Sequence, residues 1–95
     1  MIRPRHDIKI EYCCPCNYLD RVAALHEQLL LGWGPIINSI ETNPLSWGMF
    51  EVWLNGELIF SKWALERHAR DGEILDLVRA RIGPELSGYL RAQTA

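Results

Sequence analysis

The sequence lacks the features that mark membrane, secreted, repetitive or nucleic-acid-binding proteins. It has no apolar run near the ~20 residues that a membrane-spanning helix needs, and its first residues lack the apolar region of a signal peptide. It contains no internal repeat and no low-complexity segment. Its formal net charge of −2 gives no general attraction to nucleic acid or to an anionic membrane. We therefore expect a cytoplasmic protein that binds neither a membrane nor nucleic acid.

Cysteine is scarce, and its distribution is uneven. The chain has three cysteines, Cys13, Cys14 and Cys16, and none elsewhere. A secreted disulfide scaffold spreads its cysteines along the chain to link distant segments, which this arrangement does not allow. The three histidines are scattered without metal-ligand spacing, and no second cysteine pair is present. The cysteines are therefore expected to act locally, without a metal or an organic cofactor.

A strand–helix–strand unit is predicted in the first half of the chain. Residues 7–12 alternate strictly between polar and apolar side chains, which is typical of a strand with one buried face. Over residues 18–31 apolar side chains recur at three- and four-residue steps, which predicts an amphipathic helix that Gly32 and Gly34 end. A second strand is predicted over residues 36–41, and the segment that contains the next proline breaks it.

A hairpin and a final helix are predicted in the second half. Residues 49–54 and 57–61 read as strands joined by the pair Asn55-Gly56, which suits a type I′ turn because both central residues need a positive φ. Residues 72–82 carry apolar side chains at helical spacing, with Asp71 as the expected N-cap and a Gly-Pro pair after the last turn.

The predicted order of elements is therefore β-α-β-β-β-α. A strand–helix–strand unit makes its two strands parallel, and the hairpin adds antiparallel strands to the same sheet. This predicts an α/β (α+β) domain of thioredoxin-like topology with a small mixed four-stranded sheet. We expect a single domain over residues 1–95, with a core over 7–83 and a C-terminal tail over 84–95 that adds a short helical turn.

Cys13 and Cys16 are three residues apart at the predicted junction of the first strand and the first helix. This spacing lets two sulfurs meet within one turn, and a helix N-terminus stabilises a thiolate and lowers its pKa. Pro15 is expected at the first helical position, where its missing N–H is tolerated. A thiol of low pKa attacks a disulfide, and its neighbour then resolves the mixed disulfide. The pattern favours redox activity over two alternatives, a structural zinc site and small buried hydrophobic residues.

The residues around the cysteines resemble a segment of a known family. The segment Tyr12-Cys-Cys-Pro-Cys-Asn-Tyr18 resembles the Tyr-Cys-x-x-Cys-x-Tyr segment of the selenoprotein W (Rdx) family. Residues 48–52 and 56–62 resemble the Gly-x-Phe-Glu-Val and Gly-x-x-Ile-x-Ser-Lys segments of that family, whereas residues 63–71 lack its glycine-rich Phe-Pro stretch. The resemblance extends over roughly residues 8–83. It implies a thioredoxin-like fold and a thiol-based redox role.

The resemblance leaves open which cysteine attacks first and what Cys14 does. Thioredoxin chemistry makes Cys13 the attacking thiolate and Cys16 the resolving thiol, and we favour this order. The selenocysteine of related proteins maps onto Cys16, which favours the reverse order. Cys14 is interpreted as a spacer, with a third reactive thiol as the alternative. In thioredoxin a proline before the third strand faces the thiols, and Trp47 and Gly48 occupy that neighbourhood here.

Four tryptophans are many for a chain of this length. The strand over residues 49–54 is apolar on both faces. We interpret the tryptophans first as side chains that cover the edges of the core and fill loops. The alternative is an exposed apolar face, including Trp53 and Trp63, that binds a protein partner or a second copy of the chain. The function predicted overall is that of a thiol–disulfide redox protein, with oxidoreductase activity left open, that acts on a protein or a low-molecular-weight thiol or disulfide. The alternatives are a thioredoxin-fold interaction module and a small zinc-binding protein.

Overall fold

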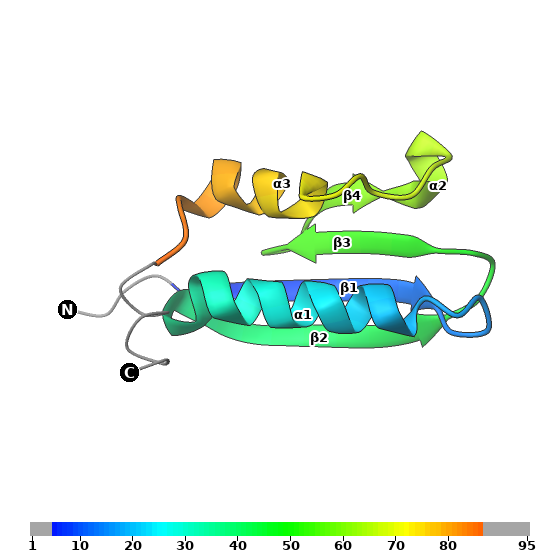
Figure 1. The fold of residues 1–95 in the computed structure, drawn as a ribbon, viewed down its shortest axis with the longest axis horizontal. Helices are drawn as coiled ribbons and strands as arrows, with labels where there is room; N and C mark the ends of the chain where they lie inside the picture. Colours follow the sequence, from blue (N-terminus) through cyan, green and yellow to red (C-terminus); the bar gives the residue numbers. More distant parts are fainter. Residues whose placement is uncertain (1–4, 87–95) are drawn as a thin grey trace.

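The computed structural model describes residues 5–86, and the expected helical turn over 85–95 falls almost entirely outside them. Three helices, a short 3₁₀ segment and four strands follow one another along the chain (Figure 1). In order they are β1 (His6–Cys13), α1 (Leu19–Trp33), η1 (Gly34–Ile36), β2 (Ile37–Leu45), β3 (Phe50–Leu54), β4 (Glu57–Ser61), α2 (Lys62–Leu65) and α3 (Glu73–Ile82). Among the described residues, no helix is long and apolar enough to cross a membrane.

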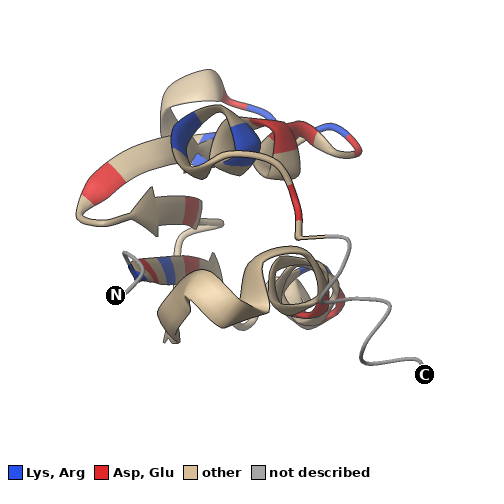
Figure 2. Cartoon of the chain, turned by 90° about the vertical axis from the view of Figure 1, so that its left-hand side faces the viewer, with Lys and Arg blue, Asp and Glu red and all other residues tan. Residues whose placement is uncertain are grey.

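The four strands form one mixed sheet in the order β2-β1-β3-β4. β1 pairs in parallel with β2, and it pairs antiparallel with β3, which in turn pairs antiparallel with β4. Helices α1 and α3 both cover the same face of this sheet, which Figure 2 shows nearly edge-on. The predicted mixed four-stranded sheet and the order of its strands are therefore confirmed, and the structure adds η1 and the short helix α2, which were not predicted.

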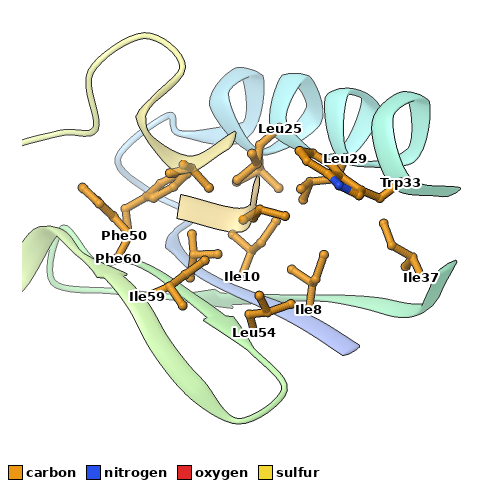
Figure 3. Close-up of a cluster of buried hydrophobic side chains, with 14 residues drawn as sticks. Ile8, Ile10, Leu25, Leu29, Trp33, Ile37, Phe50, Leu54, Ile59 and Phe60 are labelled. Atoms are coloured by element: carbon orange, nitrogen blue, oxygen red, sulfur yellow. The ribbon is translucent and has the colours of Figure 1, made fainter. Parts of the chain in front are cut away.

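The core lies between the sheet and helices α1 and α3 (Figure 3). Alternate residues of the central strands supply it, as the period of two predicts: Ile8 and Ile10 of β1 are almost fully buried. The buried hydrophobic cluster comprises Ile8, Ile10, Val22, Leu25, Leu29, Trp33, Ile37, Phe50, Val52, Leu54, Ile59, Phe60, Ile74 and Val78. Trp33 also ties the carboxyl ends of α1 and α3 together, because its Nε1–H donates to the carbonyl of Gly83 at 2.8 Å.

The β3–β4 hairpin forms as predicted. Asn55 and Gly56 both have positive φ angles, 52° and 83°. The Asn55 side chain also binds the first residues of β1, since its Oδ1 accepts the backbone N–H of Asp7 at 2.9 Å. The turn therefore sets the register of the hairpin and fixes it to the neighbouring strand.

Three predicted boundaries are wrong. The second strand runs through Pro44 to Leu45, because β2 lies at the edge of the sheet, where a missing N–H is tolerated. Gly32 lies inside α1, which ends at the next residue. The N-cap of α3 is Gly72 with a φ of 76°, and Asp71 makes no capping hydrogen bond there. At this end of α3 the Glu73 carboxylate instead accepts the backbone N–H of Arg70 at 2.9 Å.

Candidate redox site

Cys13 and Cys16 form a disulfide at the carboxyl end of β1. The S–S distance is 2.09 Å, and the two Cα atoms are 5.3 Å apart. Cys13 is the last residue of β1 and is only 1% exposed, whereas Cys16 lies at the surface. The backbone N–H of Cys13 donates to the carbonyl of Met49 at 2.8 Å, which anchors the buried cysteine to the segment before β3. The predicted pair thus joins a buried residue to an exposed one.

The expected helix start at Pro15 is wrong. Residues 14–17 form a turn, and α1 begins only at Leu19. Asn17 has a φ of 63°, in the left-handed region, and a residue in this conformation does not continue a right-handed helix. Cys16 therefore precedes the helix instead of lying in its first turn. Stabilisation of its thiolate then depends on groups other than the N-terminal N–H groups of α1.

The loop between β2 and β3 lies against the cysteine turn. The backbone N–H of Cys14 donates to the carbonyl of Leu45 at 3.0 Å, so this loop contacts the turn at both of its ends. Within the loop, Trp47 is 87% exposed. Trp47 and Gly48 both have a positive φ, 67° and 68°, which makes a tight reversal beside the cysteines. Trp47 was placed near the thiols by sequence, but its exposure was not predicted.

An aromatic and cationic cluster adjoins the turn on the helix side of the sheet. The Tyr18 ring packs edge-on against His68, with ring centroids 4.8 Å apart, and the Lys62 Nζ lies 6.0 Å from the Tyr18 ring centroid. A Cβ built on Gly48 would lie 3.7 Å from the same Nζ, which places the Lys62 ammonium beside the loop that contacts the cysteines. Burial lowers the pKa of His68, and the positive charges of Arg21 and Lys62 lower it further.

A buried carboxylate holds the helix that carries Lys62. Glu51 is only 5% exposed, and its Oε1 accepts the Ser61 hydroxyl while its Oε2 accepts the Trp63 N–H at 3.3 Å. The Ser61 Oγ in turn accepts the Ala64 N–H at 3.0 Å and caps α2. Because α2 is only one turn long, these bonds fix the position from which the Lys62 side chain extends toward Gly48 and the Tyr18 ring. The sequence resemblance covered Glu51 and Ser61 but gave no role to either.

Trp53 belongs to a different cluster, on β3. Its Nε1–H donates to the Glu11 Oε1 at 2.8 Å, and the Lys9 Nζ lies 4.9 Å from the Trp53 ring centroid. Trp53 is half-buried in this cluster, whereas Trp63 on α2 is 73% exposed. The two tryptophans expected at an interface are thus placed differently, one packed against its neighbours and one extending into solvent.

The remaining cysteine and the histidines do not form a metal centre within residues 5–86. Cys14 is a free, exposed thiol next to the disulfide. No group of three or more His, Cys, Asp or Glu side chains able to hold a metal ion lies together in that part of the chain. A tetrahedral zinc site needs four ligands, and the described residues offer Cys13 and Cys16 no such set.

Comparison with known proteins places the chain in a family. The Rdx family profile matches residues 7–80, which is most of the chain. A solved structure of a selenoprotein W-related protein from Vibrio cholerae is 28% identical, covers 80% of this chain and 95% of its own, and superposes with a TM-score of 0.74. A Bordetella parapertussis protein of known structure is 23% identical, covers 82% and 99% respectively, has a TM-score of 0.76, and shows the shared fold alone. A comparison with curated proteins gives no match. The thioredoxin-like sheet, its cysteine turn and the profile match together show that this chain belongs to the Rdx family.

Proposed function

We propose that this protein transfers electrons by thiol–disulfide exchange and cycles between a Cys13–Cys16 dithiol and disulfide. The observation that carries this function is the disulfide itself, which joins the end of a buried strand to an exposed turn. Membership of the Rdx family supports a redox role in general terms. The specific reaction, its catalytic residues and a cytoplasmic setting in which low-molecular-weight thiols return the electrons are all parts of this proposal.

The unequal exposure of the two cysteines supports the following order of events. In the reduced protein the Cys16 thiolate attacks one sulfur of a substrate disulfide, the substrate S–S bond breaks, and the leaving thiolate takes up a proton. The Cys13 thiol then loses its proton and attacks the Cys16 sulfur of the mixed disulfide, which forms the Cys13–Cys16 bond and releases the second substrate thiol. Two electrons pass to the substrate. A buried Cys13 is poorly reached from outside, so we propose this order in place of the one favoured from sequence, in which Cys13 attacks first.

Redox titration tests this function. The reduced and oxidised protein is equilibrated in glutathione buffers of defined ratio, and mass spectrometry of peptide fragments locates the bridge. We expect a single two-electron transition that ends in a Cys13–Cys16 bridge. Cys14→Ser should keep this transition, whereas Cys13→Ser and Cys16→Ser should each abolish it. A pair that never forms the bridge near the cytosolic redox poise contradicts the proposed function.

A second function, that of an interaction module, is favoured by the exposure of Trp47 and Trp63 on two segments that flank the Cys13–Cys16 turn. In that case the thiols would act at most as a switch on binding. A partner captured by wild-type protein, and equally by Cys13→Ser and Cys16→Ser under both oxidising and reducing conditions, would favour the module over the redox protein.

A further inference from the structure

A pocket of about 300 Å³ lies between α1 and the segment that enters α3. Leu25, Phe50 and Ile74 line it with apolar surface, and the first two are labelled in Figure 3. Arg21 and Arg70 line it from two different elements. Sites for whole cofactors are mostly larger, so a pocket of this size suits one large side chain or a small fragment of a ligand.

The pocket is adjacent to the cysteine turn. Phe50 lies opposite Tyr12 in the register of β1 and β3, one residue before Cys13. The ring of Tyr18 lies 6.3 Å from the Phe50 ring, centroid to centroid, and Tyr18 follows Cys16 by two residues. Tyr18 therefore packs near Phe50 in the lining of the pocket and is two residues from Cys16 along the chain, which places the pocket near the cysteine turn.

The charge around the pocket is mainly positive. Neither Arg21 nor Arg70 has a side-chain ion pair with a carboxylate of the described residues, although the Glu73 carboxylate accepts the Arg70 N–H at 2.9 Å and lies near its charge. Of the described residues that line the pocket, Asp71 is the only acidic one. His68 also lines the pocket and adds aromatic surface, but burial lowers its pKa and so disfavours its charged form. An anionic group is therefore the favoured companion of an apolar group at this site.

The surface around the exposed cysteine indicates that the ligand is a polypeptide. Leu19, at the start of α1, is 61% exposed, and Trp47 and Trp63 extend into solvent from the two segments that flank the turn. A small polar thiol would leave these apolar side chains uncovered, whereas a segment of a protein would bury them.

We propose that the pocket is a substrate subsite that receives a large apolar side chain from a protein segment next to the substrate disulfide, with an acidic residue of that segment near Arg21 and Arg70. This substrate class rests on the proposed thiol–disulfide exchange at Cys16. The subsite would select protein disulfides with apolar and acidic neighbouring residues over free glutathione disulfide.

Peptide disulfides test the subsite directly. Each substrate is a symmetric disulfide formed by two copies of a short peptide that contains one cysteine. The peptides carry phenylalanine or alanine at two, three or four positions from the cysteine. Next to that residue they carry glutamate or lysine. The rate at which each substrate oxidises the reduced full-length protein is compared with the rate for glutathione disulfide. We expect the Phe/Glu peptide with the best spacing to react about tenfold faster than its Ala/Glu counterpart, because burial of a large apolar side chain contributes on this scale.

Two pairs of variants separate the subsite from the chemistry. Ala24 lines the pocket and Ala23, its neighbour on α1, does not, so Ala24→Phe should block the pocket while Ala23→Phe serves as the matched control. Arg21→Glu should reverse the preference for a glutamate-bearing peptide, whereas the same charge change at Lys9, beside Trp53, should not. None of these variants should alter the rate with glutathione disulfide by more than about twofold.

The outcomes distinguish the two proposals. Equal rates for all peptides, or equal effects of Ala24→Phe and Ala23→Phe, overturn the subsite while thiol–disulfide exchange still stands. A wild-type protein that reacts with no disulfide, glutathione included, overturns both. The subsite is supported if Ala24→Phe loses the preference for the Phe peptide and Arg21→Glu loses the preference for the Glu peptide. The two control variants should keep both preferences, and the rate with glutathione disulfide should be unchanged.

Discussion

Cys13 and Cys16 share one disulfide, yet the first is almost completely buried and the second lies at the surface. In the proposed mechanism this asymmetry gives different roles to two residues that the spacing alone treats as equal. A reagent that approaches from solvent would attack Cys16, and the sulfur that leaves would belong to Cys13. The buried position of Cys13 is set by its place at the end of β1, where its N–H pairs with the Met49 carbonyl.

Trapping of mixed disulfides should reveal this asymmetry. In Cys13→Ser the exposed Cys16 is still free to attack but nothing resolves the product, so a mixed disulfide with a peptide substrate should accumulate. In Cys16→Ser the remaining buried thiol should react at least tenfold more slowly. The adduct is identified and quantified by mass spectrometry, with Cys14→Ser in the background of each variant so that only one thiol is present. Faster trapping at Cys13 would restore the thioredoxin-like order.

Cys14 should behave as a spacer. It is the one free cysteine of the chain and is exposed, so an alkylating reagent should label it, and only it, in the oxidised protein. Cys14→Ser should leave the midpoint of the Cys13–Cys16 redox titration within about 10 mV of wild type. A bridge that includes Cys14, found by fragment mass spectrometry during the titration, would instead make it a third redox-active thiol.

The Lys62 ammonium should stabilise the thiolate at the turn. It lies beside Gly48 and the Tyr18 ring, both of which adjoin the cysteine turn, and a nearby positive charge favours the ionised form of a thiol. Lys62→Ala should raise the pKa of the Cys16 thiol, and Lys62→Arg should restore it. Ultraviolet thiolate absorbance in a Cys13→Ser, Cys14→Ser background measures this pKa.

Lys9→Ala is the matched control for Lys62, because Lys9 carries the same charge but lies over Trp53. It should leave the pKa of the thiol unchanged. An equal shift in both variants would mean that only the net charge of the protein matters, and no shift in Lys62→Ala would exclude Lys62 from the electrostatics of the site.

The parts of the fold that sequence predicted well are those fixed by local chemistry. The alternation in residues 7–12 and the positive φ angles of Asn55 and Gly56 arise from interactions within a few residues, so β1 and the hairpin were found with small boundary errors. Pro44 shows the opposite case. Whether a strand tolerates proline depends on whether it is at the sheet edge, and that is a property of the whole topology.

In the candidate site, too, local features could be predicted from the sequence and features that depend on tertiary packing could not. The spacing of Cys13 and Cys16 indicated the chemistry, but their difference in burial depends on the packing of the β2–β3 loop against the turn. Lys62 was not predicted to reach the site, because a helix of one turn is too short for periodicity to reveal it. Its position depends on the buried Glu51 carboxylate, which is distant in sequence.

Self-association tests the predicted interface at Trp53 and Trp63. Glu51 and Trp53 lie two residues apart and thus on one face of β3, and the Trp63 N–H binds the Glu51 carboxylate, so both tryptophans are near that face. We expect sedimentation velocity to show a concentration-dependent dimer that Trp63→Ala weakens at least tenfold, with Trp47→Ala as a control of similar exposure. A protein that stays monomeric at the highest concentration would rule out the homodimer and leave a heterologous partner for this face.

Acid stability should depend on the ion pair that closes the segment between α2 and α3. Arg67 binds Glu73 through two nitrogens, at 2.8 and 2.9 Å, and this bond, with the Arg70 N–H, lowers the pKa of Glu73 from 4.5 to about 2. A carboxyl group with a depressed folded-state pKa stabilises the fold above its unfolded pKa, and the contribution is lost as the pH falls from about 4.5 to about 2. Glu73→Gln should therefore lower the Tm at pH 7 by roughly 3 °C, since the pair is partly exposed, and the difference from wild type should shrink over that window.

Glu66→Gln is the control for this pH dependence, because Glu66 is exposed on the same segment and forms no ion pair with the described residues. At each pH in this range, Glu66→Gln should have the same Tm as the wild-type protein. A Glu73→Gln protein whose Tm deficit is constant from pH 7 to pH 2 would show that the ion pair does not carry the acid sensitivity.

The same ion pair should also affect the proposed subsite. Arg70 and Asp71 line the pocket from this segment, so Glu73→Gln should slow the reaction with the Phe/Glu peptide and leave the rate with glutathione disulfide unchanged.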